Sequence, residues 1–262
     1  MCLILLAYKT HPEYDLVLLA NRDEFYDRPT TPADFWSDEP DLLAGRDLRA
    51  GGTWMGVKRN GRYAAVTNYR EPRREAGNVP SRGALVADYL KDIDPPEVFL
   101  KHLIARARLY QGFNLLVGTP DQLCFFSNRE GVVRTLEPGV YGLSNHLLDA
   151  PWFKVEQGKA ALAQALSTGR LAPEDLLAIL ADRAEAPEDR LPDTGIGAEW
   201  ERVLSPLFIA SAAYGTRSST VLLIDATGRV TFVERATGPS ATPEDIRRFD
   251  FEIQPAQARW ST

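Results

Sequence analysis

The fold is decided by the first 24 residues of the chain, MCLILLAYKTHPEYDLVLLANRDE. Two short apolar runs rich in Leu, Ile and Val, residues 2–8 and 15–20, flank a polar segment at residues 9–13. Apolar runs of this length, bounded by turn residues, are typical of buried strands. We therefore predict a hairpin at the very start of the chain, with Cys2 at the beginning of its first strand.

A second hairpin is predicted at residues 53–68. Its two strands, residues 53–58 and 62–68, flank the dipeptide Asn60-Gly61, which is favoured in type I′ turns. The predicted strands follow Gly51-Gly52 and end at Asn68.

Further along the chain, helical and strand patterns alternate in blocks. Two helices are predicted within residues 81–110, with a break at residues 94–96. Four strands of an antiparallel meander are predicted at residues 113–117, 123–127, 132–136 and 140–144, followed by helices at 152–166 and 173–181, a long surface loop at 182–198, strands at 218–225 and 229–235, and an edge strand at 249–253. This order favours an α+β fold, an αββα sandwich of two antiparallel sheets flanked by helices, forming a single domain over residues 1–262.

Composition narrows the possible functions. The chain has a formal net charge of -6, which argues against nucleic acid as a partner. A local basic group around one loop is either solvated or the mouth of a site for an anionic substrate: Arg70, Arg73, Arg74 and Arg82. No apolar run approaches the roughly 18 residues of a membrane helix, so we expect no stable membrane insertion.

The cysteines and histidines exclude other site classes. Two cysteines are too few for a disulfide framework or a cysteine-rich zinc site, and a cytoplasmic location fits them best. The three histidines are isolated from one another, and no motif for a metal, a nucleotide phosphate or a Ser-His-Asp triad occurs. We therefore predict neither a metal nor a cofactor.

Cys2 is the candidate nucleophile. Its small side chain permits removal of Met1, which would leave a thiol and a free α-amine on one residue. The α-amine has a reference pKa of about 7.7–8.0 and the thiol of about 8.5, so either group can exchange a proton near neutral pH. Taken by itself, Cys2 has a simpler explanation as a small apolar residue of a buried strand. Catalysis requires that Met1 is removed.

Polar residues at strand ends strengthen the catalytic interpretation. Each has an ordinary explanation as a strand terminator, a salt-bridge partner or a turn residue. Together they supply what acyl transfer to a thiol requires. Asn68 and Asn145 can donate hydrogen bonds to an oxyanion, and Arg22 or Arg217 can place positive charge near a thiolate. Asp23 can hold the α-ammonium group.

Five short motifs carry a family resemblance across essentially the whole chain. They are MC at 1–2, ANRDE at 20–24, GGTWMG at 51–56, TNYR at 67–70 and YGLSN at 141–145. This set closely resembles the NRDE family, also called the transport and Golgi organisation family. That family is similar to the choloylglycine hydrolase and penicillin V acylase branch of the N-terminal-nucleophile (Ntn) hydrolases.

The resemblance implies a role for each candidate site residue. It implies a matured Cys2 nucleophile whose α-amine acts as base, with Arg22 and Asp23 beside it. Asn68 and Asn145 match the oxyanion and substrate-orienting asparagines of the branch, and Arg217 matches its late arginine. In the acylases the early arginine and aspartate are separated along the chain, so Glu24 is the alternative to the adjacent Asp23.

Two functions remain open at this point. The first is an amidohydrolase or acyltransferase that acts on a non-peptide carbon–nitrogen amide bond of a small, partly apolar substrate. The second is a non-catalytic binding or trafficking protein for haem or acyl-lipid ligands on the same scaffold, because the resemblance also implies a link with haem trafficking and acyl-lipid homeostasis. Haem or acyl-coenzyme A would then be its partner.

Overall fold

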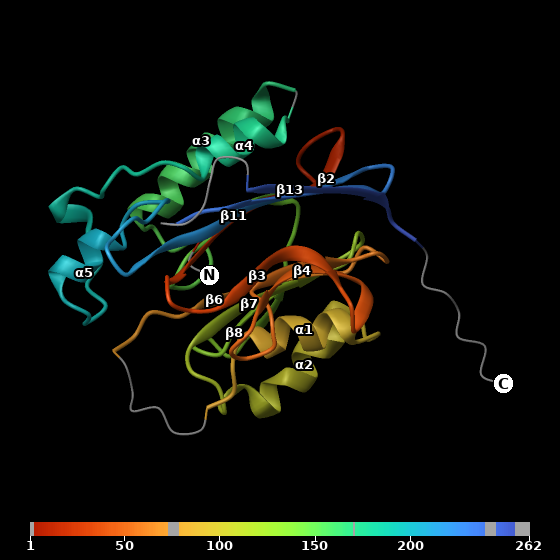
Figure 1. Ribbon diagram of the computed structural model, residues 1–262, viewed down its shortest axis with the longest axis horizontal. Helices are drawn as coiled ribbons and strands as arrows, with labels where there is room; N and C mark the ends of the chain where they lie inside the picture. Colours follow the sequence, from red (N-terminus) through yellow and green to blue (C-terminus); the bar gives the residue numbers. More distant parts are fainter. Residues whose placement is uncertain (1–2, 73–78, 170, 239–244, 255–262) are drawn as a thin grey trace.

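Two antiparallel sheets form the centre of the protein (Figure 1), in a computed structural model that describes residues 3–72, 79–169, 171–238 and 245–254. The first sheet has six strands in the order β10 (Gly139–Leu143), β1 (Leu3–Tyr8), β2 (Tyr14–Phe25), β11 (Tyr214–Asp225), β12 (Arg229–Ala236) and β13 (Ile246–Glu252). The second has seven strands in chain order: β3 (Thr30–Trp36), β4 (Glu39–Asp47), β5 (Met55–Lys58), β6 (Tyr63–Asn68), β7 (Phe113–Gly118), β8 (Leu123–Ser127) and β9 (Val133–Thr135).

Helices cover the outer face of each sheet. Helices α3 (Phe153–Ser167) and α4 (Pro173–Ile179) lie over the six-stranded sheet, and α1 (Gly83–Lys91) and α2 (Pro96–Ala107) lie over the seven-stranded sheet (Figure 1). A short helix, α5 (Ala198–Val203), lies at one end, after the 3-10 turn η1 (Glu188–Arg190). The predicted αββα sandwich is confirmed. Within the described ranges, none of the helices combines the length and apolar character needed to traverse a bilayer.

Strand β1 shows how the sequence produces this layering. Successive side chains of a strand point to opposite faces of its sheet. Leu3 and Leu5 accordingly join the core beneath α3 and α4, whereas Ile4 and Leu6 join the core between the two sheets. All six residues of β1 are buried, because both faces of this central strand are covered.

Several elements differ from the sequence-based prediction. The segment ANRDE does not end the first hairpin, because β2 continues through it to Phe25. Strands β3 and β4 were not predicted, and polar residues that are at least partly exposed flank or interrupt their apolar residues. Strand β10 leaves the predicted meander and pairs with β1 in the other sheet. The predicted loop at residues 182–198 contains η1, and α5 begins at its end.

The second predicted hairpin forms, with a different turn. Strands β5 and β6 pair, and Gly61 has a φ of 84°. A type I′ turn needs positive φ at both central residues. Asn60 lacks it, since only Lys9 and Asp149 among the described non-glycine residues have positive φ. The Gly61 N–H bonds to the Lys58 carbonyl and the Lys58 N–H to the Arg62 carbonyl, so the type I′ expectation is wrong.

The GGTWMG motif contains a close backbone contact. A Cβ atom added to Gly52 would lie 2.5 Å from the Gly83 carbonyl carbon at the start of α1. The Gly52→Ala change must therefore push two backbone segments apart, and we expect it to lower the free energy of unfolding by about 1–3 kcal/mol in urea denaturation. Gly51→Asn is the control, because Gly51 has open space and a φ of 76°, which asparagine tolerates. Equal stability of the two variants would contradict this explanation.

Candidate active site

The strand registers place the start of β1 between two groups of predicted site residues. Leu3 pairs with Asn21 of β2 on one side, and Ile4 pairs with Leu143 of β10 on the other. Arg22 follows Asn21, and the YGLSN motif continues past Leu143. Cys2 itself lies outside the described residues; it is bonded to Leu3.

Arg22 is a buried cation on the face of β2 that looks toward the second sheet. It is 4% exposed, and its guanidinium carbon lies 4.3 Å from the centre of the Trp54 ring. Its Nη1 atom has no hydrogen-bond partner among the described residues. Burial lowers the pKa of Arg22 below its usual value; the negative charge of Glu24 acts against this shift, and the positive charge of Arg217 adds to it. The indole face supplies part of the stabilisation that water would otherwise give.

Asp23 and Glu24 occupy different environments. Asp23 is 2% exposed and accepts a hydrogen bond of 2.7 Å from the Thr216 hydroxyl. Because side chains alternate along β2, Asp23 projects from the opposite face of the sheet to Arg22. Glu24 is half-buried; it accepts a hydrogen bond from the Phe25 N–H, and its second oxygen lies 3.8 Å from Arg28 Nε. Asp23 is therefore the buried carboxylate of the two.

Asn68 and Asn145 meet where the two sheets join, although 77 positions separate them. The Asn145 side-chain amide donates a 2.9 Å hydrogen bond to the Asn68 carbonyl, and Asn145 is 5% exposed. One residue earlier in each segment, the Thr67 hydroxyl donates to the Ser144 carbonyl at 2.7 Å. Asn114 donates to Thr67 Oγ1 at 3.0 Å. These bonds fix the end of β6 against the end of β10.

Arg70 also stabilises the junction of the two sheets. Its backbone N–H donates to the Asn145 carbonyl at 2.6 Å, and its guanidinium forms a buried ion pair with Glu201 of α5. The guanidinium carbon also lies 4.6 Å from the centre of the Trp152 ring. Glu201 in turn accepts two hydrogen bonds from Thr194. Chain segments far apart in sequence thus converge on Asn145.

The arginines of the expected basic loop lie in different environments. Arg70 is buried in its ion pair, so the expectation of a solvated side chain is wrong for it. Arg82 donates to the Gly112 carbonyl at 3.1 Å. Arg73 and Arg74 lie outside the described residues.

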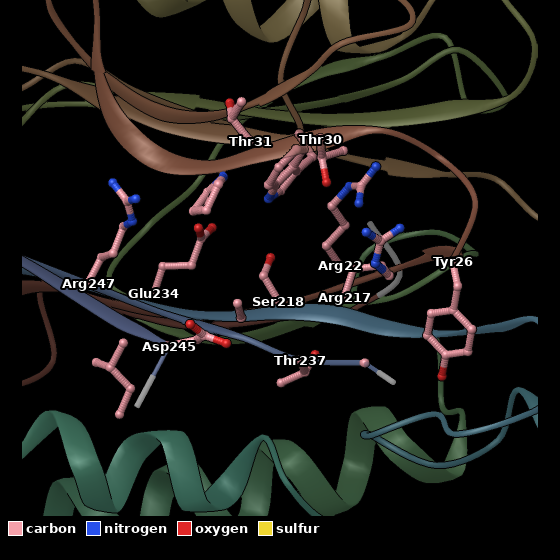
Figure 2. Close-up of a pocket in the computed structure, with 15 residues that line it drawn as sticks. Arg22, Tyr26, Thr30, Thr31, Arg217, Ser218, Glu234, Thr237, Asp245 and Arg247 are labelled. Atoms are coloured by element: carbon pink, nitrogen blue, oxygen red, sulfur yellow. The ribbon is translucent and has the colours of Figure 1, made fainter. Parts of the chain in front are cut away.

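A cavity of about 500 Å³ lies beside Arg22, between the two sheets. Figure 2 shows Arg22, Glu234 and Arg247 extending from the six-stranded sheet toward Thr30 and Thr31 of β3. The described residues that line it are Arg22, Tyr26, Thr30, Thr31, Pro32, Trp54, Arg217, Ser218, Glu234, Ala236, Thr237, Gly238, Asp245, Ile246 and Arg247. The lining combines charged groups with apolar surface.

The second predicted arginine also reaches this cavity. Arg217 lies at an irregularity in the pairing of β11 with β2, between the paired residues Thr216 and Ser218. Its Nη1 atom donates to the Phe25 carbonyl at 2.8 Å and to the Arg28 carbonyl at 3.1 Å. These acceptors are neutral, so they orient the guanidinium without cancelling its charge.

Glu234 is a cavity residue that the sequence-based reasoning missed. It is 3% exposed and accepts a 2.6 Å hydrogen bond from the Ala33 N–H of β3. Burial raises the pKa of Glu234, while the Ala33 bond and the nearby charge of Arg22 act against the shift. In the sequence it stands within an ordinary amphipathic strand, and only the pairing of the two sheets reveals its position.

His146 lies beside the asparagine pair. Its ring is 5.0 Å from the ring of Tyr69 and 5.9 Å from that of Trp152, centre to centre, and burial lowers its pKa. In the part of the chain that the structure describes, no group of three or more His, Cys, Asp or Glu side chains is arranged to hold a metal ion.

Four of the predicted residues therefore form two groups around the start of β1. Arg22 and Arg217 line the cavity, and Asn68 and Asn145 meet at the junction of the sheets. Asp23 lies on the other face of β2, against Thr216. The residues that sequence reasoning missed are Trp54, Glu201 and Glu234, although the motif GGTWMG contains Trp54; Arg70 was named only as part of the basic loop.

The fold and these residues define a four-layer αββα protein with polar groups collected at the start of its first strand. Residues 1–239 match the family model for Transport and Golgi organisation 2. The chain belongs to that family. It is 40% identical to the Bos taurus Transport and Golgi organization protein 2 homolog, over 97% of this chain and all of the relative, and 37% identical to the Homo sapiens homolog over the same shares.

Solved structures with a similar fold have low sequence identity to this chain. Penicillin V acylase from Agrobacterium tumefaciens is 14% identical, with a TM-score of 0.44 over 96% of this chain and 86% of the acylase. The C2A mutant of conjugated bile acid hydrolase from Clostridium perfringens is 9% identical, with a TM-score of 0.45 over 95% of this chain and 92% of the hydrolase.

Proposed function

We propose that the protein is an N-terminal-cysteine amidohydrolase or acyltransferase that cleaves a non-peptide carbon–nitrogen amide bond of a small, partly apolar substrate. One observation carries this proposal: Arg22 on one side and the Asn68–Asn145 pair on the other flank the start of β1. A nucleophile bonded to Leu3 would have a cation and amide donors within its surroundings.

The proposed reaction begins with Cys2 after removal of Met1. The α-amine takes the thiol proton, and the thiolate attacks the substrate carbonyl to form a carbon–sulfur bond. The carbon–nitrogen bond then breaks, and the protonated α-amine returns its proton to the leaving amine. Water or a second amine cleaves the acyl-enzyme and regenerates the thiol.

Arg22 and the asparagines supply the electrostatic part of this proposal. Positive charge near a thiol lowers its pKa and so raises the thiolate fraction. The Asn145 amide has two N–H donors, of which one satisfies the Asn68 carbonyl. The second N–H and the Asn68 side-chain amide are the proposed donors to the oxyanion. Their attachment to both sheets holds them in place before substrate arrives.

Asp23 is the proposed partner of the α-ammonium group. It lies two residues along β2 from Asn21, which pairs with Leu3, and it is more deeply buried than Glu24. A buried carboxylate stabilises a nearby ammonium group more strongly than a solvated one does, because less water screens the interaction.

The proposal is tested by mass spectrometry of the purified protein before and after reaction with an activated acyl ester. We expect the intact mass to lack Met1 and the acyl group to be found on Cys2. Cys124→Ala is the matched control: this second cysteine is buried and its thiol pKa is raised by burial, so labelling should persist without it. Retention of Met1 together with an unlabelled Cys2 would contradict the proposal.

Titration with haem and with acyl-coenzyme A separates catalysis from simple binding. Saturable binding that is unchanged in Cys2→Ala, without turnover of any acyl amide, would contradict the enzymatic proposal and favour a binding or trafficking protein.

A further inference from the structure

Two arginines of the cavity form no direct ion pair among the described residues. Among the described lining residues are three arginines, Arg22, Arg217 and Arg247, and two acidic residues, Glu234 and Asp245. Arg247 is paired with Asp34 of β3 at 2.9 Å. Within the described part of the chain, neither Arg22 nor Arg217 forms a salt bridge. Two guanidinium groups therefore share one cavity wall without a carboxylate in direct contact, although the charges of Glu24 and Glu234 act on Arg22 from farther away.

Two neighbouring guanidinium groups without a direct ion pair destabilise the folded protein unless an anionic ligand binds to them. A buried charge is ordinarily paired or fully hydrogen-bonded, because burial removes the stabilisation that water provides. Arg22 is 4% exposed, retains an unpartnered Nη1 donor among the described residues, and lies near a second cation. A bound anion would satisfy that donor and offset the repulsion between the two arginines.

We propose that the cavity binds the oxyanion of its ligand, a carboxylate or a phosphate, between the guanidinium groups of Arg22 and Arg217. The planar guanidinium presents parallel N–H donors that match the oxygens of either group. A volume of about 500 Å³ exceeds what an inorganic ion needs, so the anion belongs to a larger molecule. Trp54 and Pro32 offer apolar surface to the rest of that molecule.

An ionised Glu234 side chain would weaken the binding of an anion in this cavity. Its carboxyl group lies in the same cavity and is buried. Because this group repels an anion when ionised, we expect Glu234→Gln to tighten anion binding about tenfold. Glutamine retains a side-chain oxygen that can accept the Ala33 N–H bond, so the link between β12 and β3 should survive.

This inference deepens the proposed function, since it takes the cavity as the substrate pocket. The anion site and the proposed reaction at Cys2 can nevertheless be disproved separately. Benzoate and phenyl phosphate contain no amide bond, and benzamide is compared in Cys2→Ala, which lacks the proposed nucleophile and should bind the anions as the wild type does. Loss of anion binding and absence of Cys2 acylation are therefore different results.

The test is calorimetric titration with benzoate, phenyl phosphate and the neutral isostere benzamide. We expect at least one of the two anions to bind wild type and Cys2→Ala saturably and at least tenfold more tightly than benzamide. The tighter of the two anions identifies the oxyanion that the site prefers. If neither anion binds at least tenfold more tightly than benzamide, or if neither binds saturably, the proposal is overturned without requiring any variant to fold.

Substitution of Arg22 gives an independent test. Arg22→Gln should weaken binding of the preferred anion at least tenfold, and Arg22→Lys should retain part of the affinity because it keeps the charge. Arg46→Gln is the matched control: Arg46 also lies over a tryptophan, Trp36, at 4.2 Å, but it is paired with Asp38 and is outside the cavity. A loss smaller than tenfold in folded Arg22→Gln, or an equal loss in Arg46→Gln, would overturn the proposal.

Discussion

Replacing Glu201 by alanine is expected to lower the free energy of unfolding by about 3–5 kcal/mol, the usual cost of breaking a buried ion pair. The side chains of Arg70 and Glu201 are 7% and 3% exposed. Without the carboxylate, the Arg70 guanidinium would remain buried against Trp152 with its charge uncompensated. Thr194 would also lose both hydrogen bonds that it donates to Glu201.

Urea denaturation followed by circular dichroism measures this loss. Arg202→Ala is the control in the same helix, because Arg202 is half exposed and lies 3.6 Å from an almost fully exposed Glu188; we expect a change below about 1 kcal/mol. The double variant Arg70→Met/Glu201→Leu should recover part of the loss, since apolar side chains often replace a buried ion pair at little cost. A loss below about 1 kcal/mol in Glu201→Ala would show that Arg70 finds other compensation.

The Arg70–Glu201 pair also explains why α5 matters to the candidate site. Arg70 bonds to the Asn145 carbonyl through its backbone and to Glu201 through its side chain. Helix α5 thereby supports the junction of the two sheets at the position where the proposed oxyanion donors lie. The positions of those donors therefore depend on Glu201, which is distant in sequence from all five motifs that carry the family resemblance.

The fold could be predicted from local patterns wherever both faces of a strand are buried. Strand β1 reads as an uninterrupted apolar run because α3 and α4 cover one face and the second sheet covers the other. Strands β3 and β4 lack that signal, since partly exposed polar residues flank or interrupt their apolar ones. The continuation of β2 through Arg22 and Asp23 was hidden as well, because buried polar residues resemble a strand end when only sequence is considered.

Long-range pairing accounts for what the sequence could not show about the site. Strand β10 joins β1 across more than 130 positions, and this pairing brings Asn145 toward the start of the chain. The same is true of Glu234, which contacts β3 across 201 positions. Residue types identified Asn68, Asn145, Arg22 and Arg217 as chemically suited to one site, while the structure was needed to show that Arg22 and Arg217 line one cavity.

Replacing Asn145 by alanine is expected to slow acylation of Cys2 by an activated ester about 100–1000-fold, the usual effect of removing one oxyanion donor. Attack on an ester carbonyl builds negative charge on its oxygen, and the proposed second N–H of Asn145 would stabilise that charge. The substitution also removes the bond to the Asn68 carbonyl, so that both members of the asparagine pair are affected. The rate is measured from intact mass at increasing times.

Alkylation of the same thiol distinguishes this role from a general disturbance of the site. Iodoacetamide reacts with a thiolate by displacement of iodide and builds no oxyanion, so its rate should change less than about threefold in Asn145→Ala. Asn114→Ala is the matched control, because Asn114 lies at the same junction but donates to Thr67 and to the His146 carbonyl. It should lower stability while leaving ester acylation of the folded protein nearly unchanged. If Asn145→Ala slows both reagents equally, Asn145 acts by maintaining the thiolate or its surroundings, and the oxyanion assignment is wrong.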